Sequence, residues 1–196
     1  MRTRDENKEE AIRQKAIELI VTNGLEGFSI HKLAKAANVS PATIYIYYKD
    51  KEDLVVNITA DVFNKMQEHS LRNFSSDMSF EEGLRIQWKN RATFFLENPV
   101  EVQFVEHLRY SPVYNKIAQC IKNEFKMIMG KFVHNAVEKK QLVPLPFEVY
   151  WSVAFAPLYQ LMKFHTQGFS YVSPGFTLTN EIMEETLQYV LKALKP

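Results

Sequence analysis

Groups that can donate hydrogen bonds to phosphate are concentrated in one short stretch of the chain. Ser40 is a typical N-cap residue and Pro41 suits the first position of a helix, so the free backbone N–H groups of this helix start can bind an anion. Further hydroxyl groups and two lysines follow within the next eleven positions. The side chains concerned are Ser40, Thr43, Tyr45, Tyr47, Lys49 and Lys51. This pattern indicates contact with phosphate groups.

Three tyrosines, Tyr45, Tyr47 and Tyr48, fall within four positions of this stretch. A helix shorter than about ten residues cannot bury all three, and a buried tyrosine needs a partner for its hydroxyl. We assign Tyr48 to the core together with Ile44, which lies four residues earlier on the same helix face. The alternative is that all three tyrosines are ordinary core residues.

Composition alone gives no reason to expect a nucleic-acid partner, because the net charge is +1 and residues 1–53 contain nine basic and nine acidic side chains. From Gly27 to Lys49, however, the chain has three lysines and no acidic residue. Two of them, Lys32 and Lys35, either face solvent or contact phosphate, and both alternatives stay open. The balanced charge predicts modest non-specific binding.

No set of residues typical of catalysis or metal binding can be recognised. The five histidines lie far apart without a metal-ligand spacing, and the six glycines form no phosphate-binding loop. We therefore predict no enzymatic activity, no catalytic residue, no metal and no cofactor. The alternative from another class is an all-α enzyme or small-molecule-binding protein.

Several features predict a soluble, cytoplasmic protein without a membrane partner. The single cysteine, Cys120, excludes an intrachain disulfide, and no apolar signal-peptide core follows the charged N-terminus. The apolar stretch Phe147–Met162 is interrupted by polar residues and is shorter than the ~20 residues of a membrane span. At 196 residues and 46% hydrophobic content, the chain can form a real core.

The first forty residues predict two helices. An apolar stripe that includes Ile12 and Leu19 has helical spacing and ends near Gly24, where glycine can take a left-handed conformation. Ser29 then caps a short second helix. That helix ends near Asn38, a residue type that tolerates the positive φ of a sharp turn.

A third helix follows this turn from Pro41 to about Tyr48. Asp50, with Asp53 three residues later, opens a long fourth helix. Two short helices joined by a turn of three or four residues form a helix-turn-helix, in which the second helix enters the major groove of DNA.

The remainder of the chain predicts five longer helical segments separated by proline- and glycine-containing turns. They are roughly Phe80–Glu97, Val100–Arg109, Pro112–Lys140, Phe147–Gln167 and Thr179–Leu194. No alternating run is long enough to indicate a strand. We therefore predict an all-α fold of about nine helices, with a small N-terminal bundle and a larger C-terminal one.

The stretch Phe28–Leu54 resembles the DNA-binding segment of the TetR family without a break. The first helix extends the resemblance, because Ile12, Ala16, Leu19 and Gly24 match that family's first-helix core and stop. The resemblance implies a helix-turn-helix DNA-binding domain over residues 1–53. It also implies a helical effector-binding and dimerisation domain over residues 54–196.

By this resemblance the protein is expected to be a homodimeric repressor that binds a pseudo-palindromic operator in double-stranded DNA. A small, largely apolar effector would bind the C-terminal domain and release the operator. The positions implied to contact bases or phosphates are Ser29, His31, Ser40, Ala42, Thr43, Tyr45, Ile46, Tyr47, Lys49 and Lys51. The alternative is a DNA-binding regulator whose C-terminal half only dimerises or binds another protein.

The sequence departs from the family pattern at two positions. Asn38 replaces the usual turn glycine, which is physically harmless. Ile46 stands where the family commonly has a polar residue, so direct readout is expected to be poor in hydrogen bonds. We hypothesise that Ala42 and Ile46 contact thymine methyl groups and that DNA shape contributes much of the remaining specificity.

Residues 80–170 are rich in aromatic and other large apolar side chains, as expected for an apolar pocket. The residues expected to line it are Trp88, His107, Tyr110 and Tyr159. Phe147–Gln167 is apolar on nearly every side, so one face is expected to meet a second subunit. The residues expected at that dimer interface are Phe155, Tyr159, Met162, Met183, Leu187 and Val190. The alternative is that these helices are buried within one chain.

Overall fold

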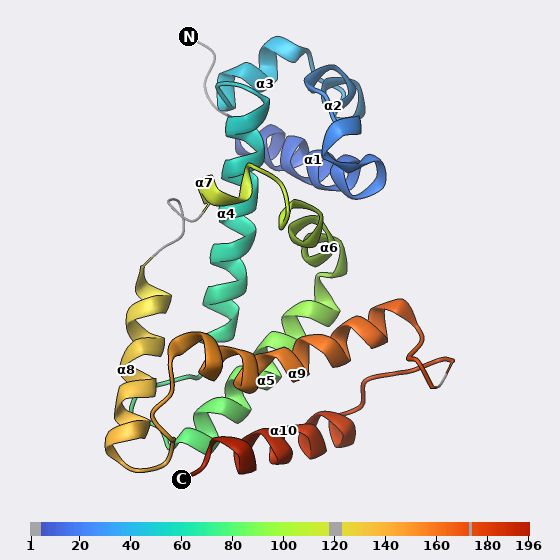
Figure 1. Ribbon diagram of the computed structural model, residues 1–196. Helices are drawn as coiled ribbons and strands as arrows, with labels where there is room; N and C mark the ends of the chain where they lie inside the picture. The colour runs from blue at the N-terminus through green and yellow to red at the C-terminus, as the bar shows by residue number, and fades with distance from the viewer. Residues whose placement is uncertain (1–4, 118–122, 173) are drawn as a thin grey trace. The chain divides into compact units, whose positions relative to one another are not determined.

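The computed structural model describes residues 5–117, 123–172 and 174–196, and these ranges are mostly helical (Figure 1). Their helices are α1 (Glu6–Gly27), α2 (Ile30–Ala36), α3 (Pro41–Tyr47), α4 (Lys51–Ser70), α5 (Phe80–Glu97), α6 (Pro99–Leu108), α7 (Tyr114–Ile117), α8 (Glu124–Glu138), α9 (Phe147–Gln167) and α10 (Asn180–Leu194). The only extended pairing in these ranges is an isolated bridge between Phe169 and Pro174. The predicted all-α fold is confirmed.

Contacts between residues divide the chain into two compact units. The first comprises the described residues of Met1–Met66 and Asn98–Lys122, and the second those of Gln67–Glu97 and Asn123–Pro196. The helices α6 and α7 therefore belong to the same unit as α1, α2 and α3, although more than fifty residues lie between the end of α3 and the start of α6. The boundary of the DNA-binding domain after residue 53 stays a prediction.

The helix starts of the first unit follow the predicted caps. The Ser29 side chain accepts a hydrogen bond from the backbone N–H of Lys32, and Ser40 does the same for Thr43. At the start of α4, the Asp50 side chain accepts from the Asp53 backbone N–H at 2.8 Å. Each cap satisfies a backbone donor that has no partner within its own helix.

The predicted break near the end of the first helix is also confirmed. Gly24 has φ 69° and ψ 170°, so the regular helix is interrupted there, although α1 extends to Gly27. Asp5 caps the other end of α1, with its carboxylate accepting from the backbone N–H groups of Asn7 and Lys8. A positive φ is accessible to glycine because it has no Cβ.

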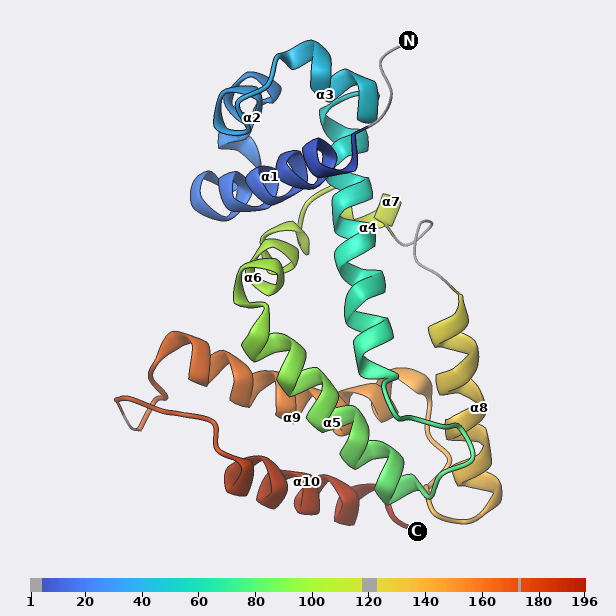
Figure 2. The ribbon, with the colours of Figure 1, turned by 180° about the vertical axis from the view of Figure 1, so that it is seen from behind.

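One hydrophobic core joins the helices of the first unit. Ile12, Leu33 and Ile44 are fully buried in it. The α6 residues that point into the same core are Phe104, Val105 and Leu108. Figure 2 shows α6 running beside α1. The position of α2 and α3 is thus fixed by a core to which α6 contributes directly.

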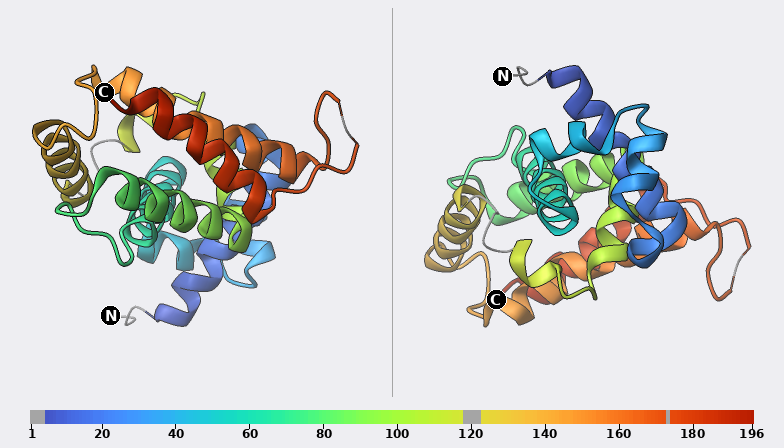
Figure 3. Two further views of the ribbon diagram at one scale, coloured as in Figure 1. Left: turned by 90° about the horizontal axis from the view of Figure 1, so that it is seen from below. Right: turned by 90° about the horizontal axis from the view of Figure 1, so that it is seen from above.

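The second unit is built from α5, α8, α9 and α10, and α10 runs alongside α9 (Figures 1 and 3). Trp88 is fully buried in its core, and its indole N–H donates to the Ala154 carbonyl at 2.8 Å. Gly83 allows α5 to approach α8 closely, because a Cβ at this position would lie 2.4 Å from the Phe132 ring.

One expected helix differs from the structure. Pro112–Lys140 was predicted as a single periodic segment, whereas its described part contains two helices, α7 and α8, and Asn123 directly before α8 is a bend. The described ranges therefore hold ten helices, against about nine predicted. Cys120 lies outside the described residues. Among the residues that are described, no helix is sufficiently long and apolar to cross a membrane, and no cluster of metal-ligating side chains occurs.

Candidate functional site

The turn between α2 and α3 fixes the orientation of α3. Asn38 adopts φ 52°, as predicted for the residue that replaces glycine in this turn. The Val39 backbone N–H donates to the Ala34 carbonyl at 2.9 Å, which closes the end of α2. Ile44 is fully buried and holds the inner face of α3 against the core. The two helices thus form the predicted helix-turn-helix.

The opposite face of α3 is exposed and largely apolar. Tyr45 is 53% exposed and Ile46 is 41% exposed, and Ala42 is exposed beside them. His31, near the start of α2, is exposed as well. The outward orientation of Ala42, Tyr45 and Ile46 is therefore confirmed, while their contacts with bases stay a prediction. Exposed large apolar side chains next to a helix cap are typical of a surface that binds a partner.

The hydroxyl groups at the start of α3 form a small cluster. The Ser40 Oγ lies 2.9 Å from the Thr43 Oγ1 and also accepts from the Thr43 backbone N–H at 3.2 Å. A hydroxyl carries only one hydrogen, and the bond between the two side chains uses one of the pair. One hydroxyl hydrogen therefore remains to donate to an outside acceptor such as phosphate.

The lysines near this surface fall into two groups. The Lys51 ammonium donates to the Phe28 carbonyl at 2.7 Å and to the Leu25 carbonyl at 3.0 Å, and the Lys32 ammonium donates to the Gly27 carbonyl at 2.7 Å. These two positive charges lie at the C-terminal end of α1, where the negative end of the helix dipole favours them.

By contrast, the exposed ammonium groups of Lys35 and Lys49 make no ion pair or hydrogen bond with the described part of the chain. They are the cations that are available to a phosphate. The sequence had placed Lys49 and Lys51 in the same role, and only Lys49 is free for it without breaking a contact within the chain.

The adjacent tyrosines Tyr47 and Tyr48 are both buried, at 9% and 4% exposure. The Tyr47 hydroxyl donates to the Asp5 carbonyl at 3.1 Å and accepts from the Asp5 backbone N–H at 3.0 Å. Tyr48 belongs to the core, as predicted, but its hydroxyl has no hydrogen-bond partner among the described residues. Burial raises the pKa of Tyr48 to about 12, with the nearby Arg13 charge opposing the shift.

This geometry changes the set of residues expected to contact phosphate. Sequence reasoning placed Tyr47 at the DNA backbone because its hydroxyl can donate. In the structure that hydroxyl is already used at the start of α1. Tyr47 is therefore not expected to donate to a phosphate without losing this contact.

The four residues expected to line a ligand pocket do not come together in one unit. Trp88 and Tyr159 belong to the second unit, whereas His107 and Tyr110 belong to the first. His107 is exposed and Tyr110 is 92% exposed, so neither lines an enclosed cavity in its own unit. Trp88 fills the core and is fully buried. The sequence could not distinguish residues that line a pocket from residues that fill the core, because large aromatic side chains serve in both places.

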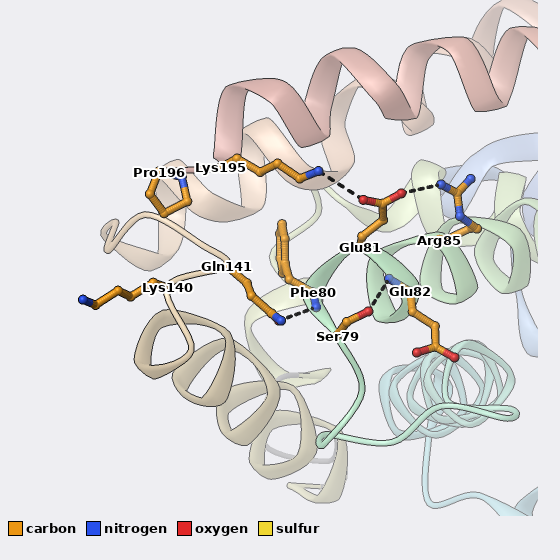
Figure 4. A pocket seen from close by; sticks show the side chains of 9 residues that line it. All are labelled: Ser79, Phe80, Glu81, Glu82, Arg85, Lys140, Gln141, Lys195 and Pro196. Carbon is orange, nitrogen blue, oxygen red and sulfur yellow. Dashed lines mark hydrogen bonds and ion pairs between the residues drawn. The ribbon is translucent and has the colours of Figure 1, made fainter.

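A cavity of about 630 Å³ opens on the second unit, at the start of α5. Figure 4 shows it with the side chains of Ser79, Phe80, Glu81, Glu82, Arg85, Lys140, Gln141, Lys195 and Pro196. Glu81 binds Lys195 and Arg85, each at 3.1 Å, and these contacts hold the pKa of Glu81 below its ordinary value. Glu82 and Lys140 also line this cavity, so its lining is largely charged and does not match the apolar pocket expected from the sequence.

Most residues expected at a dimer interface lie inside the second unit. Phe155 and Met162 of α9 are fully buried, and Leu187 and Val190 of α10 are 2% and 5% exposed. They pack in the core of one chain, which is the alternative that the sequence left open. Met183 is only partly buried, as is Tyr159, and these two remain accessible.

Instead, α9 exposes Val149, Ser152 and Ala156, which recur at helical spacing along one face. On α10, Tyr189 is 62% exposed. The two helices therefore do present uncovered surface, as the all-round apolar character of α9 predicted, but through other side chains.

Sequence reasoning missed one residue of the second unit, Arg91 on α5. Its Nη1 donates to the Tyr159 hydroxyl at 2.8 Å and its Nη2 to the Gln87 Oε1 at 3.0 Å, while its buried Nε–H has no acceptor in the part of the chain that the structure describes. The signal was its spacing: Arg91 follows Trp88 by three residues and Leu84 by seven, so a charged side chain lies on the buried face of the helix.

Comparison with known proteins agrees with this architecture. Residues 12–58 match the model of the bacterial regulatory proteins, tetR family. An uncharacterized HTH-type transcriptional regulator of Haemophilus influenzae is 34% identical over 105 residues, which are 54% of this chain and 56% of that protein. The match thus spans only about half the length of this curated relative.

Solved structures extend the similarity to the whole chain. A TetR family transcription regulator from Marinobacter aquaeolei has a TM-score of 0.75 and 28% identity, with 99% of this chain and 98% of that one covered. The transcriptional regulator FadR from Bacillus subtilis, solved in complex with stearoyl-CoA, has a TM-score of 0.73 at 17% identity, covering 93% and 97%. The likeness to the latter concerns the fold alone. Residues 12–58 therefore carry a DNA-binding domain of the TetR family, and the fold of the whole chain is similar to that of TetR family transcriptional regulators.

Proposed function

We propose that the protein is a DNA-binding transcriptional regulator, a homodimeric repressor that leaves its operator when a small, largely apolar ligand binds its second unit. The observation that carries the DNA-binding part is the outward face of α3. It exposes Ala42, Tyr45 and Ile46 while the inner face is packed in the core. A helix-turn-helix with such a face is suited to the major groove.

The proposed readout combines apolar contacts with a few phosphate contacts. Ala42 and Ile46 would contact thymine methyl groups, and Tyr45 would pack against a base or the sugar–phosphate backbone. The Ser40 and Thr43 hydroxyls would anchor one phosphate, and Lys49 would neutralise another. Lys51 would contact a phosphate only through the third N–H of its ammonium group, because the other two donate to backbone carbonyls.

The test is an electrophoretic mobility shift on DNA flanking the encoding gene, at two salt concentrations. Lys49→Ala is expected to weaken binding by a similar factor on all sequences. It should also reduce the slope of the logarithm of the binding constant against the logarithm of the salt concentration by about 0.9 for each lysine removed. Tyr45→Ala is expected to weaken specific binding most. Lys126→Ala and Tyr171→Ala are matched controls, since both side chains are exposed in the second unit.

Two results would count against this proposal. One is that the wild-type protein binds none of the fragments. The other is that the control substitutions weaken binding as much as the α3 substitutions do. The methyl contact has its own test, in which T·A pairs of the half-site are exchanged for C·G. An unchanged affinity would refute contact of Ala42 and Ile46 with thymine.

The homodimer is proposed to form through the uncovered faces of α9 and α10. Val149 and Ala156 of α9 and Tyr189 of α10 are exposed, and partly buried Met183 and Tyr159 can contribute at the margin. Sedimentation of a Tyr189→Glu variant is expected to show monomers, whereas Tyr171→Glu stays dimeric, because Tyr171 lies in the α9–α10 connection. A dimer that survives Tyr189→Glu and Ala156→Glu would place the interface elsewhere.

The ligand part of the proposal is supported by the aromatic second unit and by a relative of the same fold that was solved with stearoyl-CoA. The competing function, a regulator that binds no small molecule, is favoured by the filled core around Trp88, Phe155 and Met162, all fully buried. A thermal-shift panel of apolar compounds separates the two, because a ligand of the folded state raises the unfolding temperature.

A further inference from the structure

A guanidinium group lies among aromatic rings in the second unit without a counter-ion. The Arg91 Cζ is 4.4 Å from the centre of the Phe155 ring, 5.2 Å from that of Trp151 and 5.6 Å from that of Phe125. No carboxylate in the described ranges forms an ion pair with it. An arginine is always charged in proteins, and charged side chains are rarely buried unless an opposite charge accompanies them.

The hydrogen bonds of Arg91 fix its orientation but do not neutralise it. Its two polar partners, Tyr159 and Gln87, are uncharged. Gln87 is fully buried, and its amide also donates to the Ser70 carbonyl at 2.7 Å, so it holds the guanidinium in a fixed position. Two of the five guanidinium N–H groups are used in this way, and the buried Nε–H is not.

A second buried polar atom lies in the same core. The Tyr150 hydroxyl has no hydrogen-bond partner among the described residues, and Tyr150 is 2% exposed. Tyr150 and Arg91 both lie against the Phe155 ring, whose centre is 6.2 Å from that of the Tyr150 ring and 4.4 Å from the Arg91 Cζ. Leaving two buried polar groups unsatisfied is costly, so a bound molecule that accepts hydrogen bonds from them would remove an unfavourable contribution to the free energy.

The surroundings of Arg91 remain reachable from solvent. Phe125, Trp151, Tyr159 and Arg91 itself are all partly exposed. Phe147, one helical turn before Trp151, is 63% exposed, and the two rings lie 5.7 Å apart. A molecule with one planar anionic end and an apolar body could therefore place the anion at the guanidinium and the body against these rings.

We propose that Arg91 binds the carboxylate of an amphiphilic carboxylic acid, and that Trp151, Phe125 and Phe147 receive its apolar chain. This inference rests on the proposed function, since it specifies the ligand of the same regulator. The carboxylate accepts from the Nε–H and one Nη–H of Arg91, which is the side-on geometry that a guanidinium offers. No covalent step is involved.

The test compares dodecanoate with methyl dodecanoate and dodecan-1-ol on the wild-type full chain, by isothermal titration calorimetry without DNA. These three probes share the apolar chain and differ in charge. Dodecanoate is expected to bind at least about tenfold more tightly than the ester, because a charge-assisted hydrogen bond to a carboxylate is lost in the ester. Equal affinity for acid and ester in the wild type would overturn the inference.

Two variants check the assignment to Arg91. Arg91→Met keeps a long apolar side chain and is expected to abolish the preference for the acid, whereas Arg91→Lys, which keeps the charge but loses the fork, is expected to retain part of it. Circular dichroism establishes that each variant is folded. A folded Arg91→Met protein that still prefers dodecanoate would also overturn the inference.

Stearoyl-CoA and operator DNA distinguish the inference from the proposed function. If stearoyl-CoA releases the DNA but the wild type shows no preference for dodecanoate over its ester, the regulator is as proposed and the role of Arg91 is wrong. If dodecanoate binds through Arg91 but no compound releases DNA, the inference holds and ligand-controlled release fails.

Discussion

The adjacent residues Tyr47 and Tyr48 should respond in opposite ways to loss of their hydroxyl groups. Both rings are buried at the end of α3, but the Tyr47 hydroxyl makes two hydrogen bonds to the Asp5 backbone and the Tyr48 hydroxyl makes none with the described residues. We therefore expect Tyr47→Phe to destabilise the protein and Tyr48→Phe to leave its stability unchanged or to raise it.

The magnitudes follow from these contacts. Each hydrogen bond contributes about 0.5–1.5 kcal/mol, but Asp5 is only partly buried, so water replaces some of the loss and about 1 kcal/mol remains for Tyr47→Phe. A buried hydroxyl without a partner costs roughly 1–3 kcal/mol. Because the Arg13 charge lies near the Tyr48 hydroxyl and offsets part of this cost, we expect a gain between zero and about 1 kcal/mol for Tyr48→Phe.

The assay is equilibrium urea unfolding at a fixed protein concentration, followed by far-UV circular dichroism. Tryptophan fluorescence is an internal control, because Trp88 and Trp151 both lie in the second unit and should report an unchanged transition. A Tyr48→Phe protein less stable than Tyr47→Phe would refute the reasoning, as would a Tyr47→Phe protein as stable as the wild type. DNA affinity measured on the same variants shows whether the Tyr47 hydroxyl also binds phosphate.

The raised pKa of Tyr48 adds a second readout. The unfolded chain releases this proton near the ordinary value of 10.0, but the folded protein holds it until about 12. The unfolded state therefore binds fewer protons in this range, and stability falls as the pH rises from about 10 to about 12. The Tyr48→Phe variant should show a smaller loss of stability over this pH window than the wild type does.

Three further changes have defined outcomes. Gly83→Ala should lower the free energy of unfolding, measured by urea titration, by about 1–2 kcal/mol. The added Cβ would lie 2.4 Å from the buried Phe132 ring, and this steric clash outweighs the gain in helix propensity. Unchanged stability would show that the ring moves aside freely. Burial, aided by the Arg72 charge, lowers the pKa of His69. The unfolded state therefore takes up the proton first, and the stability of the protein should decline as the pH falls below about 6.5. His69→Gln should make that decline less steep, and a pH profile identical to that of the wild type would exclude His69 as its cause. At Asn38, with φ 52°, glycine should raise the thermal midpoint slightly and alanine should lower stability by about 1 kcal/mol, and the reverse order would contradict the turn geometry.

Local signals in the sequence were sufficient for most of the helix-turn-helix. The caps Ser29, Ser40 and Asp50, the positive φ of Asn38 and the burial of Tyr48 all depend on residues within a few positions of one another. Such features are determined by backbone donors and steric limits that a short segment already carries.

Contacts between distant segments could not be predicted in this way. Tyr47 and Asp5 are 42 positions apart, and nothing near either residue indicates the other. Helical periodicity shows that α9 is apolar on several faces but not which face meets its own chain. Phe155 and Met162 were therefore placed at a dimer interface, whereas they lie in the core.

The membership of α6 in the first unit limits how this regulator can be recombined with others. A hybrid that joined residues 1–53 to another protein's effector domain would leave out the helix that completes the hydrophobic core around Ile12 and Ile17. The missing side chains would be Phe104, Val105 and Leu108, each at most 3% exposed here. A transplantable DNA-reading module must therefore include α6, or the recipient must supply a helix with the same apolar face.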